Sequence, residues 1–149
     1  SHSCSHPRKI SALSRTELLR EWGESRRVLS EIIGEEVAVA SVPGGFYSRG
    51  VAEAVAASGY RVLFNSEPVT GACTVNGCLV LGRYSIVGKT PAETAARIVA
   101  GAVSPRLAQF LFWNAKKAAK VVAGPIYASI RSSLLRRRVS QVITSSTKS

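Results

Sequence analysis

The chain has 149 residues, a net charge of +11 and 46% hydrophobic residues. This length and hydrophobic content allow one folded domain with a core and argue against a disordered chain. All nine acidic residues are glutamates, so no aspartate of this sequence can act as a general base or a metal ligand.

The first half of the sequence predicts two successive units, each made of a helix, a glycine and a strand. Residues 14–17, Ser-Arg-Thr-Glu, form a capping box that opens a helix over 14–33, whose charges are expected on the solvent face. A buried strand is predicted over 37–42. A second helix over 48–58 precedes a strand over 60–64. Two such units favour parallel strands with helical crossovers, as in an α/β barrel or a doubly wound sheet.

The second half predicts one more strand and then only helices. A loop is expected over 65–77, followed by a strand over 78–84. The sequence Thr-Pro-Ala-Glu is a second capping box, which predicts a helix over 90–99. Another helix is expected over 104–122. After a Gly-Pro break, a last helix is expected to end near Arg138.

Two histidines stand out near the N-terminus, within the sequence Ser-His-Ser-Cys-Ser-His-Pro of residues 1–7. This stretch is too rich in serine and proline for a helix, so a strand end that runs into a loop would have to bring the imidazoles together. Neutral imidazole is the commonest protein ligand of transition metals. Catalytic zinc needs about three protein ligands and an open position. His2 and His6 are therefore a partial metal site, with Cys73 or Cys78 as a possible third ligand; the alternative is an unstructured N-terminal segment.

The order of histidine motif, amphipathic helix, strand and Pro-Gly-Gly resembles the polysaccharide deacetylases with a NodB-homology domain, carbohydrate esterase family four. The resemblance covers about residues 1–85 and implies the C-terminal part of a (β/α) barrel. Residues 86–139 are then a helical C-terminal extension packed on it, and residues 140–149 a frayed tail. The family's first motif, which carries its two aspartates, would precede Ser1, so the resemblance implies an N-terminally truncated fragment.

The resemblance also implies roles for individual residues. His2 and His6 correspond to the two histidine ligands of a divalent metal, most simply zinc. Gly44 takes the place of the aromatic residue whose backbone N–H stabilises the oxyanion, and Ser41 takes the place of an arginine. Substrate contacts fall on Pro43, Gly45, Phe46 and Tyr47. The alternative for Pro-Gly-Gly is an ordinary turn between a strand and a helix, and for the two aromatic side chains it is core packing.

The expected function is the hydrolysis of N-acetyl or O-acetyl groups on a polysaccharide or oligosaccharide. The family's fourth and fifth motifs are not recognisable here and the base is missing. This chain alone is therefore expected to be inactive. The compartment stays open between the cytoplasm and a bacterial cell envelope.

The alternative function is a non-catalytic module that associates with a glycan or a membrane surface. Residues 101–149 contain nine lysines and arginines and no acid. Such a segment suits an anionic membrane surface, although a helix packed on the domain explains the same pattern. The sequence contains no run of about 18 apolar residues, so no membrane-spanning helix is predicted. No nucleic-acid-binding motif is recognisable, and nucleic acid is not an expected partner.

Overall fold

The computed structural model describes residues 1–122, with side chains described as far as residue 118. The last predicted helix and the tail lie outside the described residues. The chain divides into two compact units, Ser1–Phe110 and Leu111–Ser149. The first unit contains the sheet and the candidate site.

The described helices follow the predicted order. The α-helices are α1 (Arg15–Ile33), α2 (Arg49–Ala57), α3 (Ala92–Val99) and α4 (Val103–Val122). Two short 3₁₀ turns, η1 (Ile10–Ala12) and η2 (Pro43–Gly45), lie at the start of the chain and directly after the first strand.

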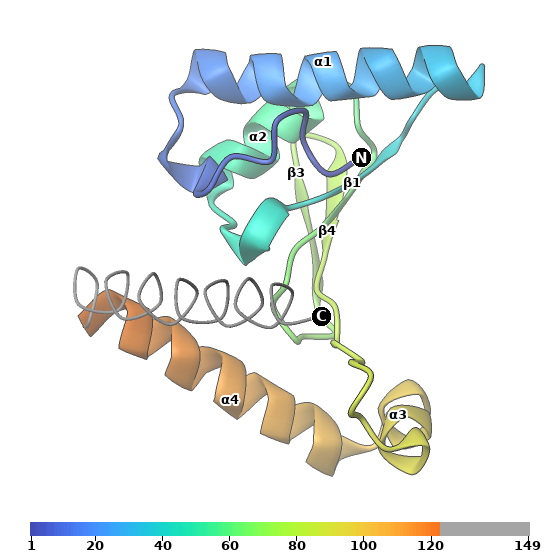
Figure 1. The fold of residues 1–149 in the computed structure, drawn as a ribbon, viewed down its shortest axis with the longest axis vertical. Coiled ribbons are helices and arrows are strands. Elements are labelled where there is room, and N and C mark those ends of the chain that lie inside the picture. Colours follow the sequence, from blue (N-terminus) through green and yellow to red (C-terminus); the bar gives the residue numbers. More distant parts are fainter. Residues whose placement is uncertain (123–149) are drawn as a thin grey trace, which may run out of the picture. The chain divides into compact units, whose positions relative to one another are not determined.

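The sheet has four strands in the order β1-β2-β4-β3: β1 (Val39–Ser41), β2 (Val62–Phe64), β3 (Ala72–Val75) and β4 (Cys78–Leu81). The three strands β1, β2 and β4 are parallel, whereas β3 pairs antiparallel with β4. Figure 1 shows α1 and α2 together at one side of these strands. The predicted α/β class is confirmed, and the parallel connection from β1 to β2 passes through helix α2 as expected. The connection from β2 to β4 passes through strand β3 instead of a helix. The expected (β/α) barrel stays a prediction, since the described residues form a four-stranded sheet.

The outer edge of β1 is occupied by the first residue of the chain. The Ser1 amino group donates to the Val39 carbonyl at 2.9 Å, and the Ser41 N–H donates to the Ser1 carbonyl at 2.9 Å. These two bonds, on either side of Ala40, are the pattern of a parallel pair. Ser1 therefore extends the sheet by one residue, and the histidine motif starts where this pairing ends.

One strand was predicted as loop. The sequence Asn76-Gly77 lies between β3 and β4, and both residues have positive φ, 47° and 82°. Two such residues form the tight turn that matches the twist of a β-hairpin, which is why residues 72–75 fold back on β4. The hairpin register pairs Cys73 with Val80 and Cys78 with Val75, and both cysteines are free thiols.

Helix α1 begins and ends as predicted. Ser14 and Glu17 form the complete capping box, and Gly34 ends the helix in the left-handed conformation at φ 79°. The buried face contains Leu18 and Trp22 but also Glu21, which was expected on the solvent face.

Helix α3 begins without the predicted capping box. Pro91 is its N-terminal cap and provides no side-chain hydrogen bond. The Thr90 hydroxyl instead accepts a hydrogen bond from the Val87 N–H at 3.1 Å. The prediction of a capping box at 90–93 was therefore wrong, because the threonine side chain stabilises the preceding turn.

The core lies between the helices α1 and α2 and the sheet. It contains fully buried side chains of all these elements, among them Trp22, Val51, Val55 and Leu63. The Tyr60 hydroxyl donates to the Trp22 carbonyl at 3.1 Å, and the two rings pack edge to face. This core fixes α1 against β1, and both elements hold the N-terminal segment.

Candidate functional site

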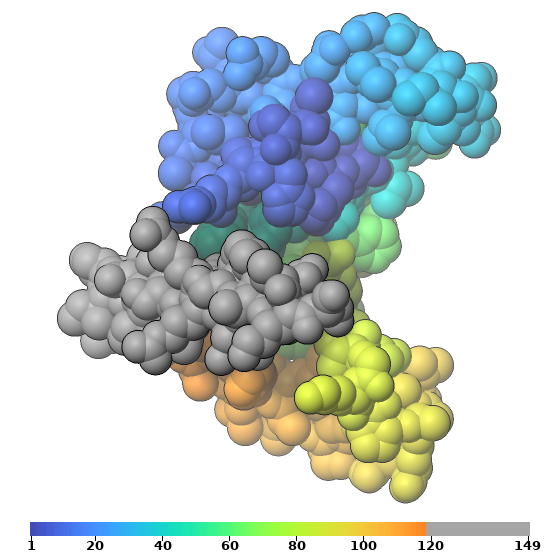
Figure 2. All heavy atoms as spheres, in the orientation of Figure 1, coloured from blue at the N-terminus to red at the C-terminus, as the bar shows by residue number. Residues whose placement is uncertain are grey.

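The two histidines of the N-terminal motif lie side by side in the structure. The ring centroids of His2 and His6 are 5.2 Å apart, with an angle of 47° between the ring planes. Both side chains are exposed, and Figure 2 shows the N-terminal residues at the surface of the molecule. The two imidazoles thus lie close together, on a loop that follows the pairing of Ser1 with β1, and their role as metal ligands stays a prediction.

Backbone conformation helps to bring the rings together. Ser3 and His6 have positive φ, 64° and 53°, which is uncommon for residues with a side chain. The His6 N–H donates to the Ser3 hydroxyl at 3.2 Å and closes the loop between the two histidines. Residues in such conformations persist only where the surroundings hold them.

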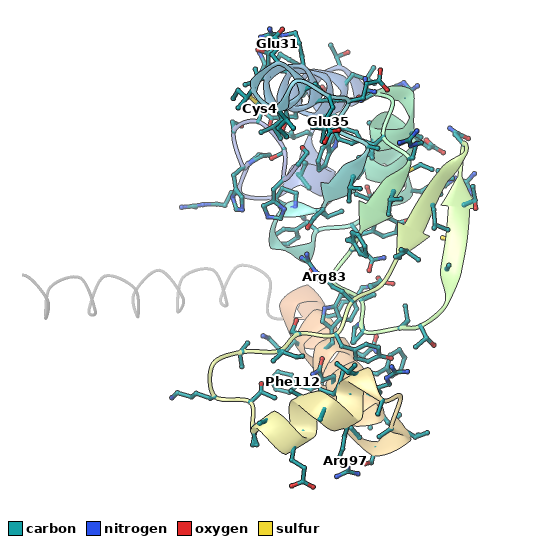
Figure 3. All side chains as sticks on the ribbon, turned by 90° about the vertical axis from the view of Figure 1, so that its right-hand side faces the viewer. Cys4, Glu31, Glu35, Arg83, Arg97 and Phe112 are labelled. Atoms are coloured by element: carbon teal, nitrogen blue, oxygen red, sulfur yellow. The ribbon has the colours of Figure 1, made fainter. Side chains whose placement is uncertain are left out.

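Side chains of helix α1 support the loop that carries the two histidines. The Glu21 carboxylate accepts hydrogen bonds from the Cys4 N–H at 3.0 Å, the Ser5 N–H at 2.9 Å and the Ser5 hydroxyl at 2.7 Å. One turn later, the Ser25 hydroxyl donates to the Ser3 carbonyl at 3.2 Å. Figure 3 shows Cys4 beside this helix. Glu21 is thus buried because it satisfies the backbone of the loop that carries the histidines.

His2 is oriented by strand β1. Its Nδ1 lies 2.8 Å from the Ser41 carbonyl oxygen, an acceptor, so Nδ1 carries the proton and the lone pair is on Nε2. Desolvation lowers the pKa of His2 and the Ser41 hydrogen bond raises it, while the positive charges of His6 and Arg83 lower it again. The net pKa lies below the ordinary value, which favours the neutral ring.

The Pro-Gly-Gly turn directly follows β1. Gly44 is exposed and has a φ of 59°, and its N–H has no acceptor among the described residues. The N–H groups of Gly45 and Phe46, by contrast, donate to the Val42 and Pro43 carbonyls. A side chain at position 44 would lie 3.0 Å from the Phe46 ring. The Phe46 ring therefore occupies the space next to Gly44.

The remaining predicted substrate residues are less accessible than Gly44. Pro43 is fully buried, and Phe46 and Tyr47 are half-buried and pack on the core. Gly45 is tightly placed, because a Cβ there would lie 2.9 Å from the Ser66 side chain. The turn is thus built into the fold, with Gly44 as its exposed point.

Arg83 contacts the strand end that orients His2, and the sequence did not predict this position. It follows β4 by two residues, and its guanidinium donates to the Ser41 hydroxyl at 2.8 Å and to the Ser66 hydroxyl at 3.1 Å. Figure 3 shows Arg83 where β4 leaves the sheet. A positional signal was available: ligands of open α/β sheets bind beyond the carboxyl ends of parallel strands, and Arg83 lies at such an end.

No third metal ligand accompanies the histidines within the described chain. Among these residues, no group of three His, Cys, Asp or Glu side chains that could hold a metal is found. A zinc site that combines the histidines with Cys73 or Cys78 is therefore not formed. A pocket of about 390 Å³, lined by residues that include Pro68, Tyr84 and Phe110, contains none of the predicted site residues.

A comparison with known protein families gives a match over residues 1–63. This stretch matches the polysaccharide deacetylase family, and it contains the histidine motif, α1, β1 and the Pro-Gly-Gly turn. The match ends within β2, before Arg83 and the β3–β4 hairpin. Neither the curated proteins nor the solved structures contain a significant match to the chain.

Proposed function

We propose that this chain, whose residues 1–63 match the polysaccharide deacetylase family, forms part of a metal-dependent centre that removes N-acetyl or O-acetyl groups from a polysaccharide. The observation that carries the proposal is the juxtaposition of His2 and His6, with ring centroids 5.2 Å apart. The two rings lie on a loop held by β1 and α1, and the Ser41 carbonyl orients one of them.

His2 and His6 are suited to be two of the three protein ligands of a zinc centre, and a third ligand would have to be supplied. Imidazole suits zinc, and a hydrogen bond from the second ring nitrogen to a carbonyl is the usual support of a histidine ligand. His2 has this support from Ser41. We propose that a carboxylate from a segment outside this sequence completes the centre, and that the chain is a fragment of a larger barrel. The parallel pairing of Ser1 with β1 supports a further strand at this edge.

Different groups of the chain would have different roles in acetyl hydrolysis. When bound, a divalent metal supplies Lewis-acid polarisation of the acetyl carbonyl. His2 and His6 would hold it, His2 through Nε2. The Gly44 N–H, which has no other acceptor among the described residues, would donate to the oxyanion that develops on the carbonyl oxygen. The loop of Pro43, Gly45, Phe46 and Tyr47 would form the rim that contacts the sugar. The general base would come from outside this sequence.

Metal titration tests the two-ligand centre directly. We expect Zn²⁺ to shift the ring resonances of both histidines in the NMR spectrum of the full chain. His2→Ala and His6→Ala should each weaken binding by about tenfold or more, in line with the loss of one ligand. Cys73→Ser is the matched control and should have no effect. Zinc binding that survives the replacement of both histidines would contradict the proposal.

Activity is tested by acetate release from an N-acetylated chito-oligosaccharide. We expect no release by this chain alone, because it lacks the base and the third ligand. A version extended at its N-terminus by the encoded upstream residues should release acetate, and His6→Ala in that version should abolish the release. Chelator-sensitive activity of the short chain would show that the centre is complete without further residues.

A second candidate function, peripheral binding to an anionic membrane, is favoured by the exposed face of the part of α4 that belongs to the second unit. Leu111 and Phe112 are 59% and 67% exposed, and Ala115 and Ala118 lie on the same face. The Lys116 ammonium lies 5.3 Å from the Phe112 ring centroid, at the border of this face. An apolar face bordered by lysines suits the interface of anionic lipids. Within the described residues, no helix has the length and apolar character needed to cross a bilayer.

Vesicle co-sedimentation tests this second function. The full chain should bind vesicles that contain phosphatidylglycerol and not pure phosphatidylcholine vesicles. The double substitution Leu111→Ser and Phe112→Ser should reduce binding, while Ile32→Ser with Ile33→Ser, an equally exposed pair at the end of α1, should not. Equal binding of both double variants would remove the proposal.

A further inference from the structure

Arg83 is positioned by the backbone around it. Gly82, which precedes it, has no room for a side chain: a Cβ would lie 2.4 Å from the Glu67 carbonyl oxygen and 2.6 Å from that of Val69. The Arg83 N–H donates to the same Glu67 carbonyl at 3.0 Å. The loop that follows β2 thus lies directly on the end of β4 and sets the point from which the arginine side chain extends.

The guanidinium is held by two neutral hydroxyls that come from the ends of two other strands. Ser41 is the last residue of β1 and Ser66 follows β2 by two residues. A guanidinium has five N–H donors, so these two bonds leave donors for a further acceptor. No ion pair of Arg83 is found among the described residues, whereas Arg26, Arg27 and Arg49 each contact a glutamate.

Ser41 joins this guanidinium to the histidine site. Its hydroxyl accepts from Arg83 and its carbonyl accepts from His2 Nδ1, both at 2.8 Å. The groups that act electrostatically on His2 are all cationic: His6, Arg83 and the Ser1 amino group. An oriented guanidinium that forms no ion pair with a carboxylate of the described residues, and that adds its positive charge to the surroundings of His2, favours an anionic ligand.

We propose that Arg83, held by Ser41 and Ser66, binds a small carboxylate, and that this carboxylate is acetate. The choice of acetate rests on the proposed function. Hydrolysis of an acetamide by water breaks the carbon–nitrogen bond and yields one acetate and one amine, which takes up a proton. The acetate product is a planar carboxylate, and a guanidinium binds planar carboxylates through paired N–H donors. The sequence match to the deacetylase family ends at residue 63, so the family assignment does not include Arg83.

The test is an NMR titration of the full chain, free of metal, with sodium acetate. Sodium chloride and sodium sulfate at the same ionic strength serve as reference salts. Acetate should give saturable shifts of the Arg83 Nε resonance and of the His2 ring that neither reference salt reproduces. Arg83→Gln should weaken acetate binding at least about tenfold, as expected for loss of a charged bidentate donor. Arg83→Lys, which keeps the charge without the planar fork, should restore only part of the affinity.

Arg97 provides the matched control. It is also an exposed arginine with a guanidinium hydrogen bond to a serine hydroxyl, that of Ser104 at 2.9 Å, but it is on α3. Arg97→Gln should leave acetate binding unchanged. Equal binding of sulfate would overturn the carboxylate assignment, and unchanged acetate binding in Arg83→Gln would overturn the site. Both results are independent of zinc binding and of hydrolysis, so a failure here is distinguishable from a failure of the proposed function.

Discussion

Glu21 and Ser5 form the contact that links helix α1 to the histidine loop. The Glu21 carboxylate accepts from both the backbone N–H and the hydroxyl of Ser5, at 2.9 and 2.7 Å, while its own residue is only 6% exposed. The residues that it holds lie between the two histidines. The position of His6 relative to His2 therefore depends on a side chain that makes no contact with either ring.

Glu21→Gln tests this dependence. The amide oxygen could still accept from the Cys4 and Ser5 N–H groups, and the Ser5 hydroxyl could turn to accept from the new NH₂ group, but all three hydrogen bonds would lose the charge that strengthens them. We expect the free energy of unfolding to fall by about 1–3 kcal/mol, measured by urea denaturation. Glu31→Gln changes an exposed ion pair with Arg27 on the same helix and should cost less than about 0.5 kcal/mol. Zinc affinity should also fall in Glu21→Gln and not in Glu31→Gln.

The same contact predicts a pH dependence of stability. Burial raises the pKa of Glu21, but the hydrogen bonds from Ser5 and Cys4 lower it by more, so the folded pKa lies below the ordinary value of 4.5. An acid with a lowered folded pKa stabilises the protein above its unfolded pKa and loses this contribution as the pH falls through the folded pKa. The free energy of unfolding should therefore decrease below about pH 4.5.

Comparison with Glu21→Gln isolates the contribution of this carboxylate. Glu17 and Glu24 also have lowered pKa values, through hydrogen bonds to Ser14 and Arg27, and they remain in both proteins. The difference in free energy of unfolding between wild type and Glu21→Gln should shrink as the pH is lowered. A difference that stays constant from neutral pH to about pH 3, below the usual carboxylate range, would show that the Glu21 charge is not involved.

The sequence contains two capping-box patterns, but only the one at Ser14 forms, so the two caps should differ in their effect on stability. Ser14→Ala removes the hydroxyl that accepts from the Glu17 N–H at the start of α1, and should cost about 1 kcal/mol. Thr90→Ala removes no cap of α3, because its hydroxyl bonds to Val87. We expect circular dichroism melts to show a lower midpoint for Ser14→Ala than for Thr90→Ala. The reverse order would mean that Thr90 caps α3 in solution.

Most features encoded locally in the sequence were predicted well, although the capping box expected at Thr90 does not form. The cap at Ser14, the glycine stop at Gly34 and the order of helices and strands are consequences of residues within a few positions of one another. The hairpin signal Asn76-Gly77 was also local. The segment 72–75 is short and mostly exposed, so it lacks the alternation of apolar and polar residues that would have indicated a strand. The convergence of His2 and His6 was predicted from a family motif, and its metal remains a prediction.

Features that depend on distant residues were not predicted. Glu21 has the sequence context of a solvent-facing helix charge, and only the loop 16 residues away gives it hydrogen-bond partners. Arg83 and Ser41 are 42 residues apart and meet because β4 and β1 lie on either side of β2. Ile32 follows the apolar periodicity of α1 yet is 76% exposed, because the helix extends beyond the sheet-facing core there. Pattern arguments specify the elements, and tertiary contacts decide which polar groups become a site.

Gly82→Ala tests whether the position of Arg83 depends on the close approach of the loop after β2. The new Cβ would lie 2.4 Å from the Glu67 carbonyl oxygen and 2.6 Å from that of Val69, and both are backbone atoms that cannot rotate away. We expect a loss of about 3 kcal/mol in the free energy of unfolding, at the upper end of the usual cost of overpacking. Acetate affinity should fall as well, since a shift of this loop moves both Ser66 and the Arg83 backbone.

Gly71→Ala is the control for this last prediction. Gly71 is on the same loop, a Cβ added to it would meet no atom within 4 Å, and its φ is not positive. The effect of this substitution on stability should be close to zero, or slightly stabilising because alanine restricts the unfolded chain. If Gly82→Ala unfolds at the same urea concentration as Gly71→Ala, the loop after β2 can shift without a loss in the free energy of unfolding. The preorganisation of Arg83 would then have to come from Ser41 and Ser66 alone.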